Sequence, residues 1–271
     1  MSVLAMLPSL SMSPLALISA FTIAGGLLSV LAASLFLVLP VAARERLLPH
    51  MISFATGALL GASLLALLPH AIVHAGHRLH QLGAALVAGI LVFFVLEKLV
   101  LWRHSHDHGH DCGEHSPILP KRARSSAWLV LIGDSLHNFV DGLVIGAAFL
   151  ANPNLGVASA IAVIAHEIPQ EVGDFAIFLR GGFSVPRALG LNLLSSLASL
   201  VGGWVAYFTL GQAQDLLPYA LALAVASLLY VAMSDLIPGL HQRTDARTAL
   251  SQVGLIAAGI LLIALTHAHA D

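Results

Sequence analysis

Two short segments carry an unusual density of side chains that can bind metal ions. They are DSLHNFVDG at 134–142 and HEIPQEVGD at 166–174, and together they hold five carboxylates and two histidines. Both lie inside apolar runs long enough to cross a lipid bilayer. Ionisable side chains are costly at bilayer depth, so their clustering indicates a functional site. Imidazole and carboxylate together favour Zn²⁺ and other first-row divalent ions.

Helical spacing places these side chains on two faces. Asp134, His137 and Asp141 stand at i, i+3 and i+7, with Asn138 beside them. In the second segment one stripe holds His166, Gln170 and Asp174, and an adjoining stripe holds Glu167, Glu171 and again Asp174. Two such faces turned toward each other would form a cage around a metal ion. Pro169 removes a backbone N–H inside this second helix, so we expect a kink beside the cage.

We assign a role to each of these side chains. His137, Asp141 and His166 are predicted to bind the ion, and Gln170 to act as a weaker oxygen ligand. Asn138 and Glu167 are predicted to form an adjoining second site or a relay. The remaining acidic residues, together with two more distant side chains, are predicted to support the ligands or line the path of the ion; these are Asp134, Glu171, Asp174, His70 and Asp235.

The composition indicates an all-α polytopic membrane protein in contact with the lipid bilayer. Of 271 residues, 58% are hydrophobic and only 10% are charged, whereas soluble domains carry about 25% charged residues. A single cysteine excludes an intramolecular disulfide framework, and the absence of a basic stripe argues against nucleic-acid binding. Eight stretches are long and apolar enough to span, at 15–39, 50–74, 82–102, 125–150, 155–180, 186–210, 215–239 and 249–268, with breaks at Pro40 and Pro49 among other positions.

The basic residues predict the orientation. Eleven of the twelve Lys and Arg residues lie in or beside the odd-numbered loops, which should therefore be cytoplasmic, with both termini outside. No Lys or Arg precedes Arg44, so we expect the first apolar run to stay as a membrane helix. Nothing divides the chain, and we predict one transmembrane domain over 1–271 in the cell membrane, with a bacterial inner membrane as the expected location.

Histidines also gather outside the two helices. The predicted cytoplasmic loop at 103–124 contains the run RHSHDHGHDCGEHSP, and such tracts bind metal weakly and exchangeably; its histidines are His104, His106, His108, His110 and His115. Four more, at positions 70, 74, 77 and 80, lie near the outer end of the second span, where they could gather ions. His267 and His269 are expected at the surface.

With these residues in place, the chain resembles the ZIP family of zinc and iron permeases, in particular its LIV-1-like branch. The segments HNFVDG and HEIPQEVGD carry the resemblance. It implies eight helices, zinc transport into the cytoplasm by movement of one helix bundle against another, and a paired metal site on His137, Asn138, Asp141, His166, Glu167 and Gln170. Gln170 stands where the branch has histidine, and the predicted span at 186–210 offers Asn192, Ser195 and Ser196 instead of a bridging glutamate.

Three functions remain under consideration at this stage. The first is a transporter of divalent cations, zinc first and Fe²⁺, Mn²⁺, Co²⁺ or Cd²⁺ as alternatives, without enzyme activity or a resident cofactor and with a homodimer as a candidate assembly. The second is an intramembrane metallohydrolase, because HEIPQ approaches the H-E-x-x-H pattern of zinc hydrolases; Gln170 and Pro169 weaken this alternative. The third is a metal sensor or store without flux.

Overall fold

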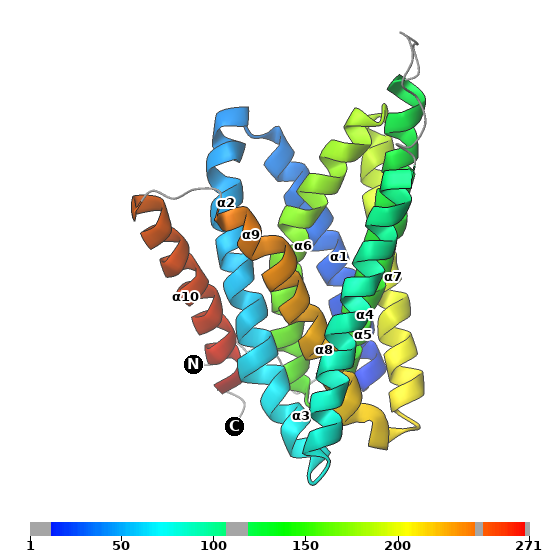
Figure 1. Cartoon of the computed structure of the whole chain (residues 1–271), viewed down its shortest axis with the longest axis vertical. Helices are drawn as coiled ribbons and strands as arrows, with labels where there is room; N and C mark the ends of the chain where they lie inside the picture. Colours follow the sequence, from blue (N-terminus) through cyan, green and yellow to red (C-terminus); the bar gives the residue numbers. More distant parts are fainter. Residues whose placement is uncertain (1–11, 107–118, 242–245, 269–271) are drawn as a thin grey trace.

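The computed structural model describes residues 12–106, 119–241 and 246–268, and every regular element in these ranges is helical (Figure 1). The elements in chain order are α1 Pro14–Val38, α2 Val41–Gly61, the π-helical η2 Ala62–Leu67, α3 Leu68–Ala75, α4 Leu79–His106, α5 Leu119–Ala151, α6 Pro153–Arg180, α7 Val185–Leu210, the 3₁₀ turn η3 Gln214–Leu216, α8 Leu217–Tyr230, the π-helical η4 Val231–Leu236, α9 Ile237–Leu240 and α10 Ala246–Ala268. The protein is therefore an all-α polytopic membrane protein.

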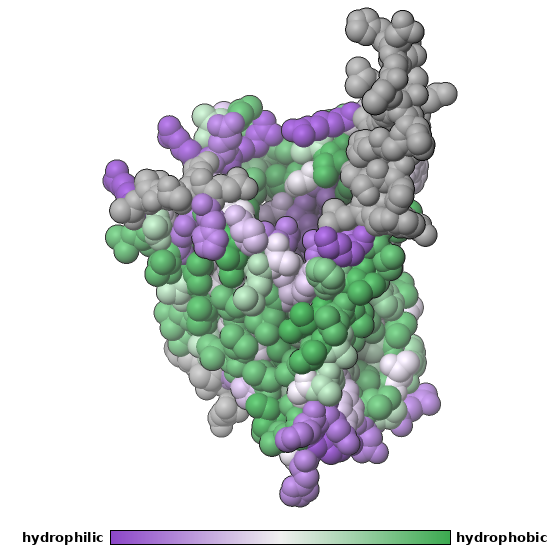
Figure 2. All heavy atoms as spheres, viewed as in Figure 1, coloured by the Kyte–Doolittle hydropathy of each residue, from purple (hydrophilic) through white to green (hydrophobic). Residues whose placement is uncertain are grey.

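Among the described residues, seven helical stretches are long and apolar enough to cross a membrane, counting α2 to α3 and η3 to α9 as one stretch each. The eighth long helix, α6, is not among them, since Glu167, Glu171 and Asp174 dilute its apolar character. Figure 2 shows apolar side chains over the middle of the visible face and polar side chains toward both ends, as expected for a surface in contact with lipid. The count of eight spans and the outside position of the termini stay predictions.

The helices pack in a defined pattern around α6 and α5. α5 lies chiefly against α7, α1 against both α6 and α7, α2 against α10 and α6, and α4 against α8. Outward-facing side chains such as Leu35, Val38 and Leu250 are more than 70% exposed. Inside the bundle, the largest group of buried apolar side chains joins η2, α3, α6 and α8.

Close contact between α5 and α7 depends on two glycines. A Cβ atom on Gly142 would lie 1.9 Å from the carbonyl oxygen of Ser199, and one on Gly202 would lie 2.0 Å from that of Phe139. Only a residue without a side chain allows the two backbones to approach this closely. Gly142 directly follows Asp141, so this contact fixes the height and rotation of the helix that carries the first cluster of polar residues.

Two prolines follow π-helical segments at the same distance. Pro69 comes two residues after η2, and Pro238 comes two residues after η4. A proline in a regular helix removes a hydrogen bond and clashes with the carbonyl four residues earlier. A local π-helical widening relieves that clash. Neither segment was expected from the sequence.

Three expectations about element ends were wrong. The predicted break at Pro49 does not occur, because α2 runs through it. The loop predicted at 103–124 is shorter, since α4 extends to His106 and α5 begins at Leu119. His104 and His106 therefore belong to α4, whereas His108, His110 and His115 lie outside the described residues.

Candidate metal centre

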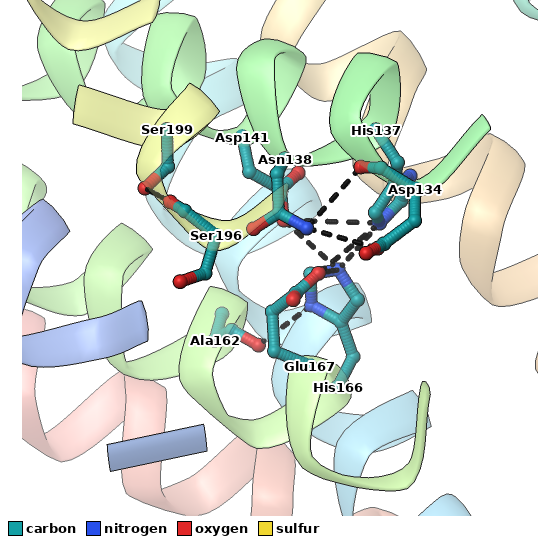
Figure 3. A network of polar contacts seen from close by, with 9 residues as sticks. All are labelled: Asp134, His137, Asn138, Asp141, Ala162, His166, Glu167, Ser196 and Ser199. Atoms are coloured by element: carbon teal, nitrogen blue, oxygen red, sulfur yellow. Dashed lines mark hydrogen bonds and ion pairs between the residues drawn. The ribbon is translucent and has the colours of Figure 1, made fainter. Parts of the chain in front are cut away.

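Four side chains from two helices meet at the centre of the bundle. His137 and Asp141 come from α5, and His166 and Glu167 come from α6. Each offers a ligand atom within 4.8 Å of those of the other three, and Figure 3 shows all four converging on one point. We call these residues the central group.

The two imidazole nitrogens form the middle of the central group. Nε2 of His137 lies 3.2 Å from Nε2 of His166, and the rings are perpendicular with centres 5.4 Å apart. Asp141 Oδ2 lies 3.1 Å from His166 Nε2. Asp141 Oδ2 is more distant from His137 Nε2, at 3.8 Å, whereas Glu167 Oε1 lies 3.5 Å from His137 Nε2 and 3.7 Å from His166 Nε2. Two nitrogens and two carboxylates at these separations match the donor set of a tetrahedral zinc site.

A backbone contact prepares His166 as a ligand. Its Nδ1 lies 3.1 Å from the carbonyl oxygen of Ala162. A carbonyl only accepts, so Nδ1 carries the proton and donates it, and the lone pair is left on Nε2. Because Nε2 points at His137 and Asp141, this tautomer is the one that can bind a metal ion.

Burial makes an empty central group unfavourable. Asp141 and His166 are each 1% exposed and Glu167 is 4% exposed. Within the described part of the chain, Asp141 Oδ1 and both carboxylate oxygens of Glu167 have no hydrogen-bond donor. Buried polar atoms without partners cost free energy, so a divalent cation would satisfy these oxygens directly. The donor set and its unpaired oxygens both fit a bound metal ion.

The other two predicted ligands are amides, and both contact Asp134. Asn138 donates through Nδ2 to Asp134, at 2.9 Å to Oδ1 and 3.2 Å to the backbone oxygen. Gln170 is half-buried and also lies beside Asp134. Both amides therefore contact Asp134, which lies about one helical turn before His137 on α5.

The remaining acidic residues mark one side of the central group. Glu171 is fully buried, and its backbone oxygen accepts a 3.2 Å hydrogen bond from Asn192 on α7. Asp174 is half-buried and Asp235 is exposed. Exposure thus increases from the central group toward the end of the bundle where α6 finishes. His137, whose side chain is 21% exposed, is the member of the group that water reaches.

The opposite side of the central group is closed. Ala62, Ala66, Ala158 and Ala162 are fully buried there, within the apolar core that joins η2 and α6. Ser159 was not singled out by the sequence analysis, although it stands seven residues before His166 on the same face of α6. It is fully buried. His70 lies beyond this core, on α3.

Comparisons with known proteins identify the family. The family model for the ZIP zinc transporter matches residues 101–267. Zinc transporter ZIP13 of Pongo abelii is 33% identical over 237 aligned residues, in a match that covers 83% of this chain and 68% of that protein. Zinc transporter ZIP4 of Rattus norvegicus is 30% identical over 287 residues, and zinc transporter ZIP10 of Homo sapiens is 38% identical over 149 residues.

The extent of these matches differs between relatives. The ZIP4 match takes in 83% of this chain but 44% of ZIP4, and the ZIP10 match takes in 52% of this chain and 18% of ZIP10. The chain thus spans less than half of these two longer relatives. A family match over more than half of the chain, together with the ZIP13 match, establishes the family. The chain is a multi-pass membrane protein that belongs to the ZIP zinc transporter family.

Proposed function

We propose that this chain carries divalent metal ions, zinc first, across the membrane into the cytoplasm, and that the central group binds the ion on the way. The convergence of His137, Asp141, His166 and Glu167 on one point is the observation that carries the proposal. The relatives support zinc because their names describe zinc transporters. Fe²⁺, Mn²⁺, Co²⁺ and Cd²⁺ share these ligand preferences.

The two sides of the central group suggest how the ion moves. One side leads past Asp174 to the exposed Asp235, at the end where the predicted orientation places the cytoplasm. The other side is filled by the small buried side chains of η2 and α6. In this arrangement the ion leaves toward the cytoplasm, and separation of η2 from α6 would expose the central group to the outside. Asp134 and Glu171 would support the ligands during that exchange.

The alternative of an intramembrane hydrolase receives no support. Gln170 replaces the second histidine of the H-E-x-x-H pattern and contacts Asp134. The relatives are named as transporters. We therefore propose a transporter without enzyme activity. The cytoplasmic histidine tract, the homodimer, the single domain over 1–271 and the bacterial inner membrane stay predictions from the sequence.

Zinc flux into liposomes tests the proposal. Purified full-length protein is reconstituted, Zn²⁺ is added outside, and an internal fluorescent indicator follows its entry. His137→Ala and His166→Ala should each reduce flux to the protein-free background. His50→Ala is the matched control, because His50 is exposed, lies on α2 and bonds the Arg46 carbonyl; it should leave flux unchanged. Zinc binding by the wild type without any flux would overturn the transporter and favour a sensor or store.

A further inference from the structure

Three histidines meet at the closed end of the bundle. His70 and His74 lie on α3, and His267 lies in the last turn of α10. The ring centre of His70 is 5.1 Å from that of His267, with the planes at 69°, and 6.5 Å from that of His74. Figure 1 shows α3 and the C-terminal part of α10 at the same end of the molecule. His267 was expected at the surface from the sequence, but it is half-buried against His70.

The ring centres of His70 and His267 are spaced nearly as closely as those of the central pair. His137 and His166 have ring centres 5.4 Å apart and an interplanar angle of 89°. Zn–N bonds of about 2.0–2.1 Å at a tetrahedral angle place the centres of two imidazole ligands about 5 Å apart. Both pairs therefore have the spacing that two imidazoles adopt around one zinc ion. His74 stands at i+4 from His70, but its ring is stacked on that of His70 at 23° with the centres 6.5 Å apart, so it would have to turn before both could bind one ion.

The hydrogen bonds of α3 prepare these rings in the way that the Ala162 carbonyl prepares His166. Nδ1 of His70 lies 3.0 Å from the carbonyl oxygen of Ala66, and Nδ1 of His74 lies 2.8 Å from that of His70. Each carbonyl accepts, so each Nδ1 donates and the lone pair stays on Nε2. Both rings are thus held in the tautomer that presents Nε2 to a ligand.

The surroundings distinguish this cluster from the central group. His70 and His267 are half-buried and His74 is exposed, so water reaches the cluster. Imidazoles without a carboxylate among them suit borderline divalent ions such as Zn²⁺, with water completing the coordination shell. Such a site should bind and release its ion readily. The helix ends at Ala75, and Gly76 turns the chain away with φ +55°, so His77 and His80 do not extend the face of His70 and His74.

We propose that His70 and His267 form a separate binding site for Zn²⁺ and similar divalent ions at the closed end of the bundle, with water completing the coordination shell. The site collects ions at this mouth, on the far side of the apolar core from the central group. Its binding role stands by itself, whereas its effect on uptake rests on the proposed transport function.

Binding is tested in a background that silences the other histidine sites. The full-length, tag-free chain carries His166→Ala and asparagine at the five histidines of the 104–115 tract. Equilibrium dialysis against Zn²⁺ counts bound ions. His70→Ala or His267→Gln should each remove one equivalent of Zn²⁺, and His80→Ala, a matched exposed histidine at the same end, should remove none. Unchanged stoichiometry in both His70→Ala and His267→Gln would overturn the proposal, as would equal loss in His80→Ala.

The effect of this site on transport is tested by measuring zinc uptake in cells that express the otherwise wild-type chain. His70→Ala and His267→Gln should raise the KM for external zinc several-fold and leave the maximal rate unchanged, while His80→Ala changes neither value. The two proposals fail separately. If His166→Ala transports normally, the proposed function fails and the dialysis result still stands; if dialysis detects no lost equivalent, the site at the closed end fails whatever the flux.

Discussion

Two pairs of histidines with nearly the same spacing between ring centres occupy different surroundings in this protein. The central pair, His137 and His166, is flanked by Asp141 and Glu167 and is closed off on one side by the apolar core. The pair at the closed end, His70 and His267, is half-buried and has His74 as its neighbour. Ring spacing alone therefore cannot decide what each pair does. The carboxylates and the burial should make the central pair the tighter site.

Removing the charge of Asp141 should have the largest effect on the expected difference in affinity between the two histidine pairs. Asp141→Asn keeps the shape of the side chain but deletes the carboxylate that lies 3.1 Å from His166 Nε2. Zinc uptake below saturation should fall by more than about 100-fold, because even the indirect partners of metal ligands are worth 10–100-fold. Liposome flux measures the effect. A loss below threefold would mean that the charge of Asp141 does not distinguish the two pairs.

Glu167→Gln should have a smaller effect of the same sign. The nearest approach of Glu167 Oε1 to a histidine nitrogen is 3.5 Å, longer than the 3.1 Å of Asp141 Oδ2, so we expect it to contribute less to the ion than Asp141 does. Uptake at low zinc should fall about 10-fold, with part of the loss recovered at high zinc. The same variant checks the hydrolase alternative, in which the glutamate acts as the base and its loss abolishes turnover at every substrate concentration. Equal losses in Asp141→Asn and Glu167→Gln would contradict the ranking by distance.

The central pair also depends on close helix packing. In Gly142→Ala the new methyl group would lie 1.9 Å from the Ser199 carbonyl oxygen, so α5 and α7 must separate. We expect a loss of stability of about 1–3 kcal/mol, typical of overpacking, measured by thermal unfolding in detergent. Gly190→Ala on α7 is the matched control, since a Cβ atom there meets nothing within 4 Å among the described residues. Equal unfolding temperatures for the two variants would contradict the role of this contact.

Much of the central group could be predicted from helical spacing. His137 and Asp141 stand one turn apart, as do His166 and Gln170, and the bilayer context made their function evident. Spacing does not fix rotation, however. Gln170 shares the stripe of His166, yet it lies beside Asp134. The pairing of His70 with His267 joins helices far apart in the sequence and depends on how α10 packs against η2, for which a single sequence carries no periodic signal.

Gln170→His tests whether the side chain at position 170 faces the ion, and we expect it to have the smallest effect of these substitutions. The resemblance to the LIV-1-like branch places a histidine at this position, and an imidazole would add a third ring one turn beyond His166. The side chain at 170 lies beside Asp134, so the new ring should reach the ion only in part, and the KM for zinc should fall by no more than about threefold. Uptake at several zinc concentrations measures this. A fall of more than about 30-fold would show that position 170 contacts the ion directly, and the central group would then have five members.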